Sequence, residues 1–357
     1  MSFVHANLTQ DLEKYFQQLS YRKLTKITLI NDDKIFVSIP SYRDPECSKT
    51  IQNLIDKAKD PVKLVIVVCQ QNSTDDEDCL SGVLDMKGAE IKVKRLLDSD
   101  AKGPCWARFL IQQEWQGEEY YLQIDSHMRF VKDWDQRCRD ELAKCPANSC
   151  LSTIPARYSI TDESLDDNPL RGPMYVSGLD YLGDGFFQYS ADPIISADKP
   201  LKSRGYAACF SFSSSKIMHD APYDPYTPFL FYGEEPDIHA RLFTRGWRVY
   251  APSQPICFTT FYRKYRHTFW ENPHCRRIAS LSRLRIRYRL SIDNWFSQIN
   301  LYPSELLYSV GTSLEYFASP LPKLECLLYD IKDYQLGSQG TFTEFLTYSV
   351  KGNPLVE

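Results

Sequence analysis

The chain has 357 residues, of which 43% are hydrophobic and 25% charged, a size that suits one large domain or two modest ones. Its formal net charge is −4, and because nucleic-acid-binding proteins usually carry a basic surplus, this balance argues against nucleic acid as a partner. We find neither an apolar run of about eighteen residues nor a secretory-signal pattern near the start, so we expect no transmembrane segment and no export.

Helical spacing of apolar residues marks the beginning of the chain, where Leu12, Tyr15, Phe16 and Leu19 recur every three to four residues. We therefore predict a helical lead-in over 1–33, followed by an alternation of strands and helices. The expected strands are 34–39, 63–69, 89–96 and 119–124, and the expected helices are 47–59 and 101–114. Such alternation predicts a parallel sheet with right-handed crossovers, and ligands bind at the carboxyl ends of its strands.

The second half of the chain is less regular. We expect loops and short strands over 150–200, a strand at 205–213, a loop entering a helix within 229–246, and a last core strand at 247–251. Beyond 262 the sequence turns basic and helical and then ends in an acidic, aromatic segment. This predicts three parts: the lead-in (1–33), an α/β core (34–262) and a helical extension packed on the core (263–357).

Eleven cysteines are scattered along the chain without a C-x-x-C pair. An odd count with irregular spacing matches no common zinc pattern and does not favour a disulfide framework. We interpret them as reduced thiols of a cytoplasmic protein.

The segment 121–130 (YLQIDSHMRF) carries the strongest chemical signal. An apolar strand that ends in Asp125-Ser-His127 would place a carboxylate and an imidazole at the edge of the sheet. These two ligand types suit a divalent cation that also binds diphosphate oxygens, and such a cation neutralises charge on a leaving nucleoside diphosphate. The alternative is an ordinary strand-end aspartate that caps a turn, with His127 as a surface residue.

A second motif at 232–241 (YGEEPDIHAR) contains Glu234, Glu235 and Asp237. Carboxylates this close repel one another unless cations or hydrogen-bond donors face them. In a functional interpretation, one of them acts as a base or orients an acceptor hydroxyl, while another binds sugar hydroxyls. The alternative is helix chemistry, because acidic residues favour the first turn of a helix.

Arginines supply the third signal. Arg108 follows a Gly-Pro helix entry, where a guanidinium can bind a phosphate in a bidentate way. A basic stretch further along would attract diphosphate or an acidic partner, or form a solvated face; it consists of Arg263, Lys264, Arg266, His267, Arg276, Arg277, Arg283, Arg285, Arg287 and Arg289. P-loop, dinucleotide-binding, nucleophile-elbow and zincin motifs do not occur in the sequence.

Four blocks in order resemble the cytoplasmic GlcNAc-transferase family, whose best-known members modify a hydroxyproline on an adaptor subunit of a ubiquitin ligase. The blocks are 35–44 (IFVSIPSYRD), 101–108 (AKGPCWAR), 123–130 (QIDSHMRF) and 231–235 (FYGEE), and 334–338 (YQLGS) followed by Tyr348 also looks like that family. Mucin-type polypeptide GalNAc-transferases look like distant relatives through their Asp-x-His.

This resemblance implies a GT-A-type, Rossmann-like fold with a mixed, mainly parallel sheet, a UDP-GlcNAc donor, Mn²⁺ or Mg²⁺, and retention of anomeric configuration. It places Asp125 and His127 as metal ligands. It implies donor binding by Ser41, Tyr42, Arg43, Arg108, Asp125 and Arg263. It implies that Glu234 and Glu235 face the sugar and a protein or glycan acceptor, and together with Asp237 they are the catalytic candidates.

One departure concerns the third metal ligand, because the related enzymes supply a histidine shortly after the last core strand. Here 256–263 reads ICFTTFYR, and the first histidine is His267. Either His267 serves, or two protein ligands suffice with phosphates and water, or metal binding is weak. Three alternatives stay open: another UDP-sugar donor acting on a glycan or small molecule, an inactive relative that only binds a nucleotide sugar, or a phosphate-binding scaffold built on the basic stretch.

Overall fold

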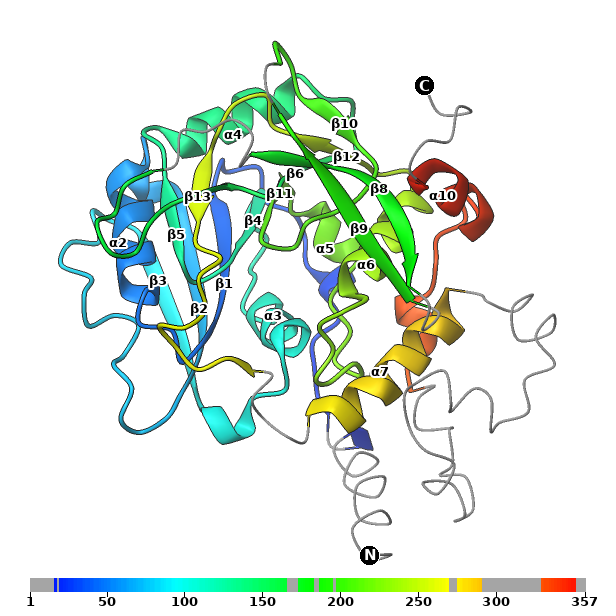
Figure 1. Cartoon of the computed structure of the whole chain (residues 1–357), viewed down its shortest axis with the longest axis horizontal. Helices are drawn as coiled ribbons and strands as arrows, with labels where there is room; N and C mark the ends of the chain where they lie inside the picture. The colour runs from blue at the N-terminus through cyan, green and yellow to red at the C-terminus, as the bar shows by residue number, and fades with distance from the viewer. Residues whose placement is uncertain are drawn as a thin grey trace, which may run out of the picture.

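The computed structural model describes residues 16–17, 19–165, 173–182, 186–194, 197–269, 275–290 and 329–350. Residues 1–15 and 18 of the predicted helical lead-in (1–33) lie outside these residues; its described part contains a short 3-10 helix, η1 (Leu24–Lys26). The helices and strands build one large sheet with helices on both faces (Figure 1).

Four parallel strands form one half of the large sheet, in the order β3-β2-β1-β4. They are β1 (Ile35–Tyr42), β2 (Leu64–Asn72), β3 (Glu90–Leu97) and β4 (Tyr120–Ile124). The connections contain α2 (Cys47–Lys57), η2 (Pro61–Lys63), η3 (Asp98–Asp100) and α3 (Pro104–Gln112). Every residue of β2 is buried, as its continuous apolar run predicts for an inner strand. The predicted alternation over 34–124 is therefore confirmed.

The other half of the sheet is mixed. Strand β11 (Phe210–Ser214) runs antiparallel to both β4 and β6 (Ser149–Ser152), β12 (Arg248–Ala251) runs parallel to β6, and β10 (Leu201–Ser203) is the antiparallel edge. Helices α4 (Trp134–Ala143), α5 (Lys216–Asp220) and α6 (Glu234–Phe243) belong to this half. The strand expected at 205–213 begins only at Phe210, and the helix and strand expected in 229–251 are present.

Two smaller sheets complete the architecture. One has the order β5-β13-β7 and consists of β5 (Met128–Phe130), β13 (Cys257–Thr259) and β7 (Ala156–Arg157). The other is a hairpin of β8 (Met174–Leu182) and β9 (Phe186–Pro193). The expectation of loops and short strands over 150–200 was wrong for this hairpin. Pairing between the two strands stabilises an extended backbone that the local Gly, Asp and Pro content does not favour.

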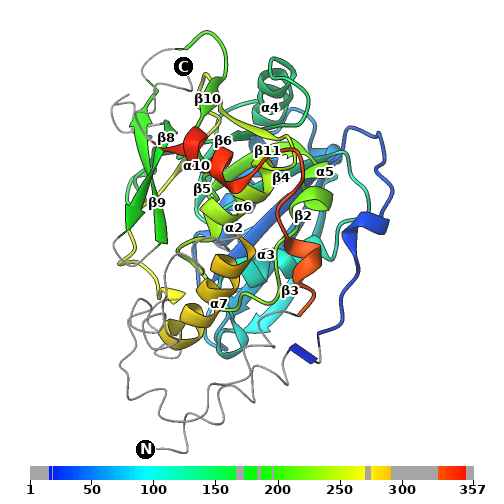
Figure 2. The same ribbon diagram turned by 90° about the vertical axis from the view of Figure 1, so that its right-hand side faces the viewer.

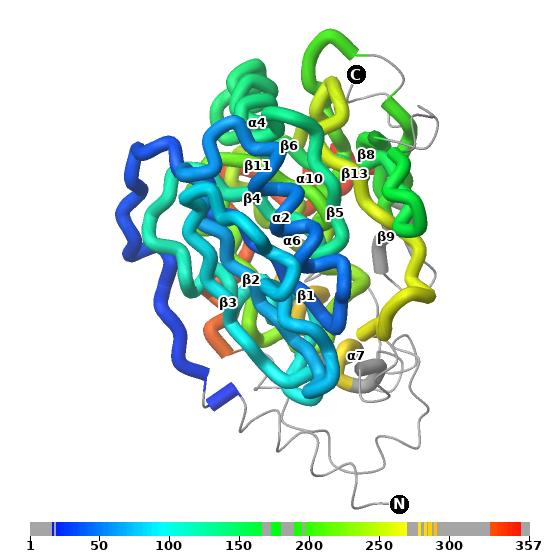
Figure 3. Tube along the Cα trace, turned by 90° about the vertical axis from the view of Figure 1, so that its left-hand side faces the viewer, coloured from blue at the N-terminus to red at the C-terminus, as the bar shows by residue number. Residues whose placement is uncertain are grey.

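Alternating side chains of the parallel strands divide the core in two. Along β1, Phe36 belongs to the hydrophobic cluster that includes Phe109 of α3, whereas Val37 belongs to the cluster that includes Ile51 of α2. In Figure 3, α2 lies in front of β1, β2 and β3, and from the opposite side α6, α7 and α10 lie in front (Figure 2). Each fully buried aliphatic side chain contributes about 1.5–3 kcal/mol.

The C-terminal part of the described chain packs into the same core. Helix α7 (Cys275–Arg289), the 3-10 helix η8 (Ile331–Tyr334) and helix α10 (Phe342–Ser349) follow the last strand. Ile286 of α7 and Phe345 of α10 join the cluster that contains Ala240 of α6. No helix in the described ranges combines the length and apolar character needed to cross a bilayer.

Buried ion pairs tie α7 to the rest of the fold. Arg289 holds Asp237 of α6 with two hydrogen bonds of 2.8 and 2.7 Å, and Arg285 donates to Asp224 at 2.8 Å. Arg289 also contacts Asp224. The interpretations of Arg285 and Arg289 as a solvated face or a diphosphate site are wrong, because their guanidinium groups are buried against carboxylates.

Breaking this buried pair should destabilise the protein. We expect Arg289→Met to lower the free energy of unfolding by about 3–5 kcal/mol, because Asp237 and Asp224 would lose a buried counter-ion. Denaturant unfolding measures the change. Lys23→Met is the matched control, since the pair of Lys23 with Asp333 is largely exposed to solvent and its loss should change the free energy of unfolding much less. Equal effects of the two substitutions would contradict a buried bracing role.

Candidate active site

A pocket opens at the carboxyl ends of β1 and β4, the edge of the sheet where the sequence predicts ligand binding. Asp125 follows β4 directly, Tyr42 ends β1, and Gly103 and Pro104 begin α3. The other lining residues come from several segments: Pro40, Gln71, Arg108, Ser126, His127, Phe231, Arg263, Arg266, Thr268 and Phe269. A Cβ at Gly103 would meet Phe269 at 3.2 Å, and its φ of +93° favours glycine, so this entry to α3 requires glycine.

Asp125 and His127 converge in this pocket. The Asp125 Oδ2 and His127 Nε2 atoms lie 3.8 Å apart, and the side chain of Asp125 keeps 24% of its surface exposed while that of His127 is buried. Thr50 of α2 fixes the loop that carries them, because its hydroxyl accepts from the Met128 N–H at 2.8 Å and donates to the Ser126 carbonyl at 2.8 Å. The two side chains are therefore held at the pocket by a rigid turn.

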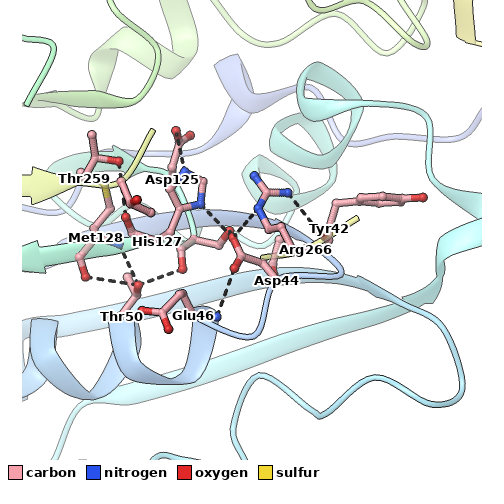
Figure 4. A network of polar contacts seen from close by, with 12 residues as sticks. Tyr42, Asp44, Glu46, Thr50, Asp125, His127, Met128, Thr259 and Arg266 are labelled. Carbon is pink, nitrogen blue, oxygen red and sulfur yellow. Dashed lines mark hydrogen bonds and ion pairs between the residues drawn. The ribbon is translucent and has the colours of Figure 1, made fainter. Parts of the chain in front are cut away.

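Asp44, in the loop after β1, holds the other side of the imidazole. Its Oδ2 lies 2.8 Å from His127 Nδ1 and accepts from Ser126 Oγ at 2.7 Å (Figure 4). Tyr265 donates to Oδ1 at 3.0 Å, and Arg266 Nε lies 3.4 Å from Oδ2. Burial disfavours the charged carboxylate, but the contacts with His127, Arg266 and Ser126 outweigh it and hold the pKa of Asp44 well below its usual range.

Arg263 faces the free nitrogen of the same imidazole. Its Nη1 lies 2.9 Å from His127 Nε2, so a positive group already stands beside the atoms that would bind a metal. One ion can contact both Asp125 and His127, because their 3.8 Å separation is less than twice the ligand distance of about 2.1 Å typical of Mg²⁺. A carboxylate oxygen and an imidazole nitrogen also suit Mn²⁺ or Mg²⁺.

Among the described residues, His267 does not join this pair: it is exposed and is not among the residues that line the pocket. Across the described ranges, no group of three or more His, Cys, Asp or Glu side chains is placed to hold a metal ion. The position of His267 does not support it as the third ligand, and the other two alternatives left open by the sequence stay predictions.

Arg108 links the Asp-x-His turn to the acidic motif. Its Nη2 lies 3.5 Å from Asp125 Oδ1, and its Nη1 donates to Glu234 Oε1 at 2.6 Å. Glu234 also accepts from Cys105 Sγ at 2.7 Å. Burial lowers the pKa of Arg108, but Glu234, Tyr223 and Asp125 raise the pKa by more than burial lowers it, so the guanidinium stays charged. Glu234 is thus engaged with α3 rather than directed into the open pocket.

The other two acidic residues have separate environments. Glu235 is half-buried and its Oε1 accepts from the Ala208 N–H at 2.8 Å. Burial, together with the nearby Glu234 and Asp125, raises the pKa of Glu235 to about 7 against the opposing effects of Ala208 and Arg108. Neither Glu235 nor Asp237 is among the residues that line the pocket, and Arg289 binds both oxygens of Asp237. Of the two, Glu235 is the one that lies near Asp125.

The predicted donor-binding residues at the end of β1 also differ in whether they line the pocket. Tyr42 lines the pocket and packs edge-on against Phe269, with ring centroids 5.6 Å apart. Ser41 is buried and does not line it. Arg43, with a φ of +47°, pairs with Asp76 at 2.8 Å and Asp98 at 3.4 Å and also lies outside the lining.

Several residues that line the pocket or contact its lining residues were not predicted as site residues from the sequence. Asp44 stands in the block 35–44 that carries the resemblance, yet nothing in the motif indicated that it would contact His127. Gln71 lies next to the last residue of β2, the strand beside β1, and Arg266 was only one member of a basic stretch. Phe231 directly precedes the acidic motif and Phe269 lies far along the chain, so only the fold assembles them here.

Comparison with known proteins adds a family and a fold. The sequence model of a family described as "Glycosyltransferase (GlcNAc)" matches residues 34–87 and 83–350, most of the chain. No curated protein matches the chain significantly.

Among solved structures, the chain is similar to GalNAc-T7 with UDP, GalNAc and Mn²⁺, at a TM-score of 0.55 and 14% identity, covering 88% of this chain and 56% of that one. The chain thus spans little more than half of that relative, and the likeness establishes a GT-A fold.

The mannosyltransferase PcManGT from Pyrobaculum calidifontis, in complex with GDP-Man and Mn²⁺, has a TM-score of 0.44 and 12% identity, covering 92% of this chain and 81% of that one. S. aureus TarS 1–349 with UDP-GlcNAc has the same score and identity, with coverages of 88% and 90%.

Replacement of the two histidines should separate their roles. We expect His127→Ala to weaken Mn²⁺ binding in the presence of UDP by about 10–100-fold or more, because His127 is predicted to be a direct ligand and even the loss of an outer-shell partner typically costs that much. His267→Ala, the matched control, should leave the affinity unchanged. Isothermal titration with Mn²⁺ measures both, and a loss confined to His267→Ala would reverse the assignment.

Glu235 should make stability depend on pH in the metal-free protein. Its folded pKa of about 7 lies above the ordinary value of 4.5, so stability is lost as the pH rises from 4.5 through 7 and the buried carboxyl ionises. Glu235→Gln removes that loss. We expect the variant to gain stability relative to the unsubstituted protein between those pH values, measured by denaturant unfolding at constant salt. A difference that does not change with pH would contradict the raised pKa.

Proposed function

Because this chain belongs to the Glycosyltransferase (GlcNAc) family, we propose that it transfers N-acetylglucosamine from UDP-GlcNAc to an acceptor hydroxyl, with retention of configuration and with a divalent cation. The observation that carries the proposal is the convergence of Asp125 and His127, 3.8 Å apart, in the pocket at the carboxyl edge of a GT-A sheet.

The charges of the pocket suit a nucleoside diphosphate. The guanidinium-bearing residues Arg108, Arg263 and Arg266 all line it, and arginine binds phosphate oxygens in a bidentate way. Arg263 is exposed, so its side chain can turn from His127 toward a phosphate when a cation takes its place. The aromatic rings of Tyr42, Phe231 and Phe269 offer flat surfaces for a base or a sugar.

Asp125 and His127 would hold the cation. When bound, Mn²⁺ or Mg²⁺ would neutralise the charge that builds on the departing UDP. Arg108 would support this step, because it contacts both Asp125 and Glu234 and would add a fixed positive charge near the bound diphosphate.

Glu235 is the residue we propose to orient sugar or acceptor hydroxyls. It is half-buried near Asp125, and one of its oxygens is held by the Ala208 N–H. Glu234 is committed to Arg108 and Asp237 to Arg289, so neither is a candidate nucleophile. We therefore favour a front-face route in which the leaving phosphate oxygen takes the acceptor proton. A glycosyl-enzyme adduct on any of the three would exclude it.

The acceptor we propose is a protein hydroxyl, of hydroxyproline or Ser/Thr, or a glycan hydroxyl. All nine cysteines whose side chains the structure describes are free thiols, which suits a reducing compartment such as the cytoplasm. A second candidate is a relative that binds the nucleotide sugar without turnover. The observation that favours it is the set of only two protein ligands among the described residues.

Donor hydrolysis separates the two. We expect the protein to release UDP from UDP-GlcNAc faster than from UDP-GalNAc when Mn²⁺ is present, and Asp125→Ala to lower this rate by about 100-fold or more, because charge stabilisation at the leaving group is lost. Asp140→Ala, a carboxylate exposed on α4, is the matched control. Absence of UDP release by the unsubstituted protein would favour the binding-only candidate, and full activity of a folded Asp125→Ala protein would remove the metal role.

A further inference from the structure

The two ring nitrogens of His127 face different partners. Nδ1 lies 2.8 Å from Asp44 Oδ2, and Nε2 lies 2.9 Å from Arg263 Nη1. An arginine guanidinium has donors only, so Nε2 must be the acceptor in the contact with Arg263. In the neutral ring the proton then resides on Nδ1 and is donated to Asp44. This tautomer leaves the lone pair of Nε2 directed into the pocket, on the side of Asp125.

We propose that Asp44 is a positioning residue, which fixes the tautomer and ring orientation of His127 so that Nε2 can bind a divalent cation together with Asp125. The inference rests on the proposed function, because it concerns the same cation. Metal-binding histidines generally donate their second ring N–H to a carboxylate or a carbonyl, and such partners affect metal affinity strongly.

The carboxylate of Asp44 is well suited to this role because it is itself immobile. Its side chain is fully buried. Oδ2 receives the Ser126 hydroxyl at 2.7 Å as well as His127, and Oδ1 receives the Tyr265 hydroxyl at 3.0 Å and the Glu46 N–H at 3.1 Å. Four donors from three parts of the chain therefore define where the carboxylate points, and the imidazole follows it.

These partners also predict how an amide would behave at position 44. The Glu46 N–H is a backbone donor and cannot reverse, so an Asn side chain must place its oxygen on that side. Its NH₂ group then faces His127 Nδ1, where the ring must become the acceptor and carry its proton on Nε2. The Ser126 hydroxyl can rotate to accept, and the side chain of Arg266 can turn aside. Asp44→Asn therefore preserves the packing and reverses the tautomer of His127. Because a protonated Nε2 has no free lone pair, it cannot bind a cation.

The test combines a spectroscopic and a binding measurement on the full chain. The first measurement is an NMR spectrum of metal-free protein labelled with ¹⁵N-histidine at pH 8, in which the signals of His127 are assigned by their absence in His127→Gln. We expect these signals to show the proton on Nδ1. In Asp44→Asn the proton should reside on Nε2. Titration with Mn²⁺, alone and with UDP, should show a loss of about 10–100-fold in affinity for Asp44→Asn.

Tyr265→Phe is the matched control, because it removes another hydrogen bond to the same carboxylate without facing His127. It should leave the tautomer and the Mn²⁺ affinity unchanged. A proton on Nε2 in the unsubstituted protein would overturn the inference whether or not Asp44→Asn folds, and so would an Asp44→Asn protein with unchanged tautomer and affinity. If the tautomer reverses and Mn²⁺ binding falls while no donor is hydrolysed, the positioning role stands and the proposed catalysis fails.

Discussion

Parallel pairing of β1 with β4 is the constraint on which the site depends. The register runs from Ile35 opposite Tyr120 to Ser38 opposite Gln123, so the two strands end at the same edge of the sheet. The loops that follow them carry Asp44 and the turn with Asp125 and His127. The 2.8 Å contact between Asp44 Oδ2 and His127 Nδ1 therefore depends on the backbone hydrogen bonds that pair β1 with β4 inside the core.

Charge in the site is distributed so that most buried carboxylates already have a donor or a cation. Asp44 has His127 and Arg266, and Glu234 has Arg108. Asp125 is more exposed than these, and its nearest cation, Arg108, lies 3.5 Å away. The surroundings of Asp125 are therefore where a further positive charge is most favourable, and the 2.9 Å contact of Arg263 with His127 shows that a cationic group fits there.

The acidic motif illustrates how one short segment serves three purposes. Glu234, Glu235 and Asp237 stand in the first turn of α6, where the helix dipole favours them. Within that turn they point to different partners: Glu234 to Arg108, Glu235 to the Ala208 N–H, and Asp237 to Arg289 of α7. The last pair ties α6 to α7, so α7 helps to hold the helix that carries Glu235.

The sequence by itself determined the parallel half of the sheet and the Asp-x-His turn, because continuous apolar runs, helical periodicity and a short motif are local signals that neighbouring residues carry. It did not determine the β8–β9 hairpin, the burial of Arg285 and Arg289, or the separation of Asp237 from Glu235. Nor did it show that Asp44 would meet His127, 83 positions away, or that His267 would lie outside the pocket. Such outcomes depend on which distant segments become neighbours, and only the tertiary structure decided whether a charged side chain met a buried counter-ion, an imidazole or water.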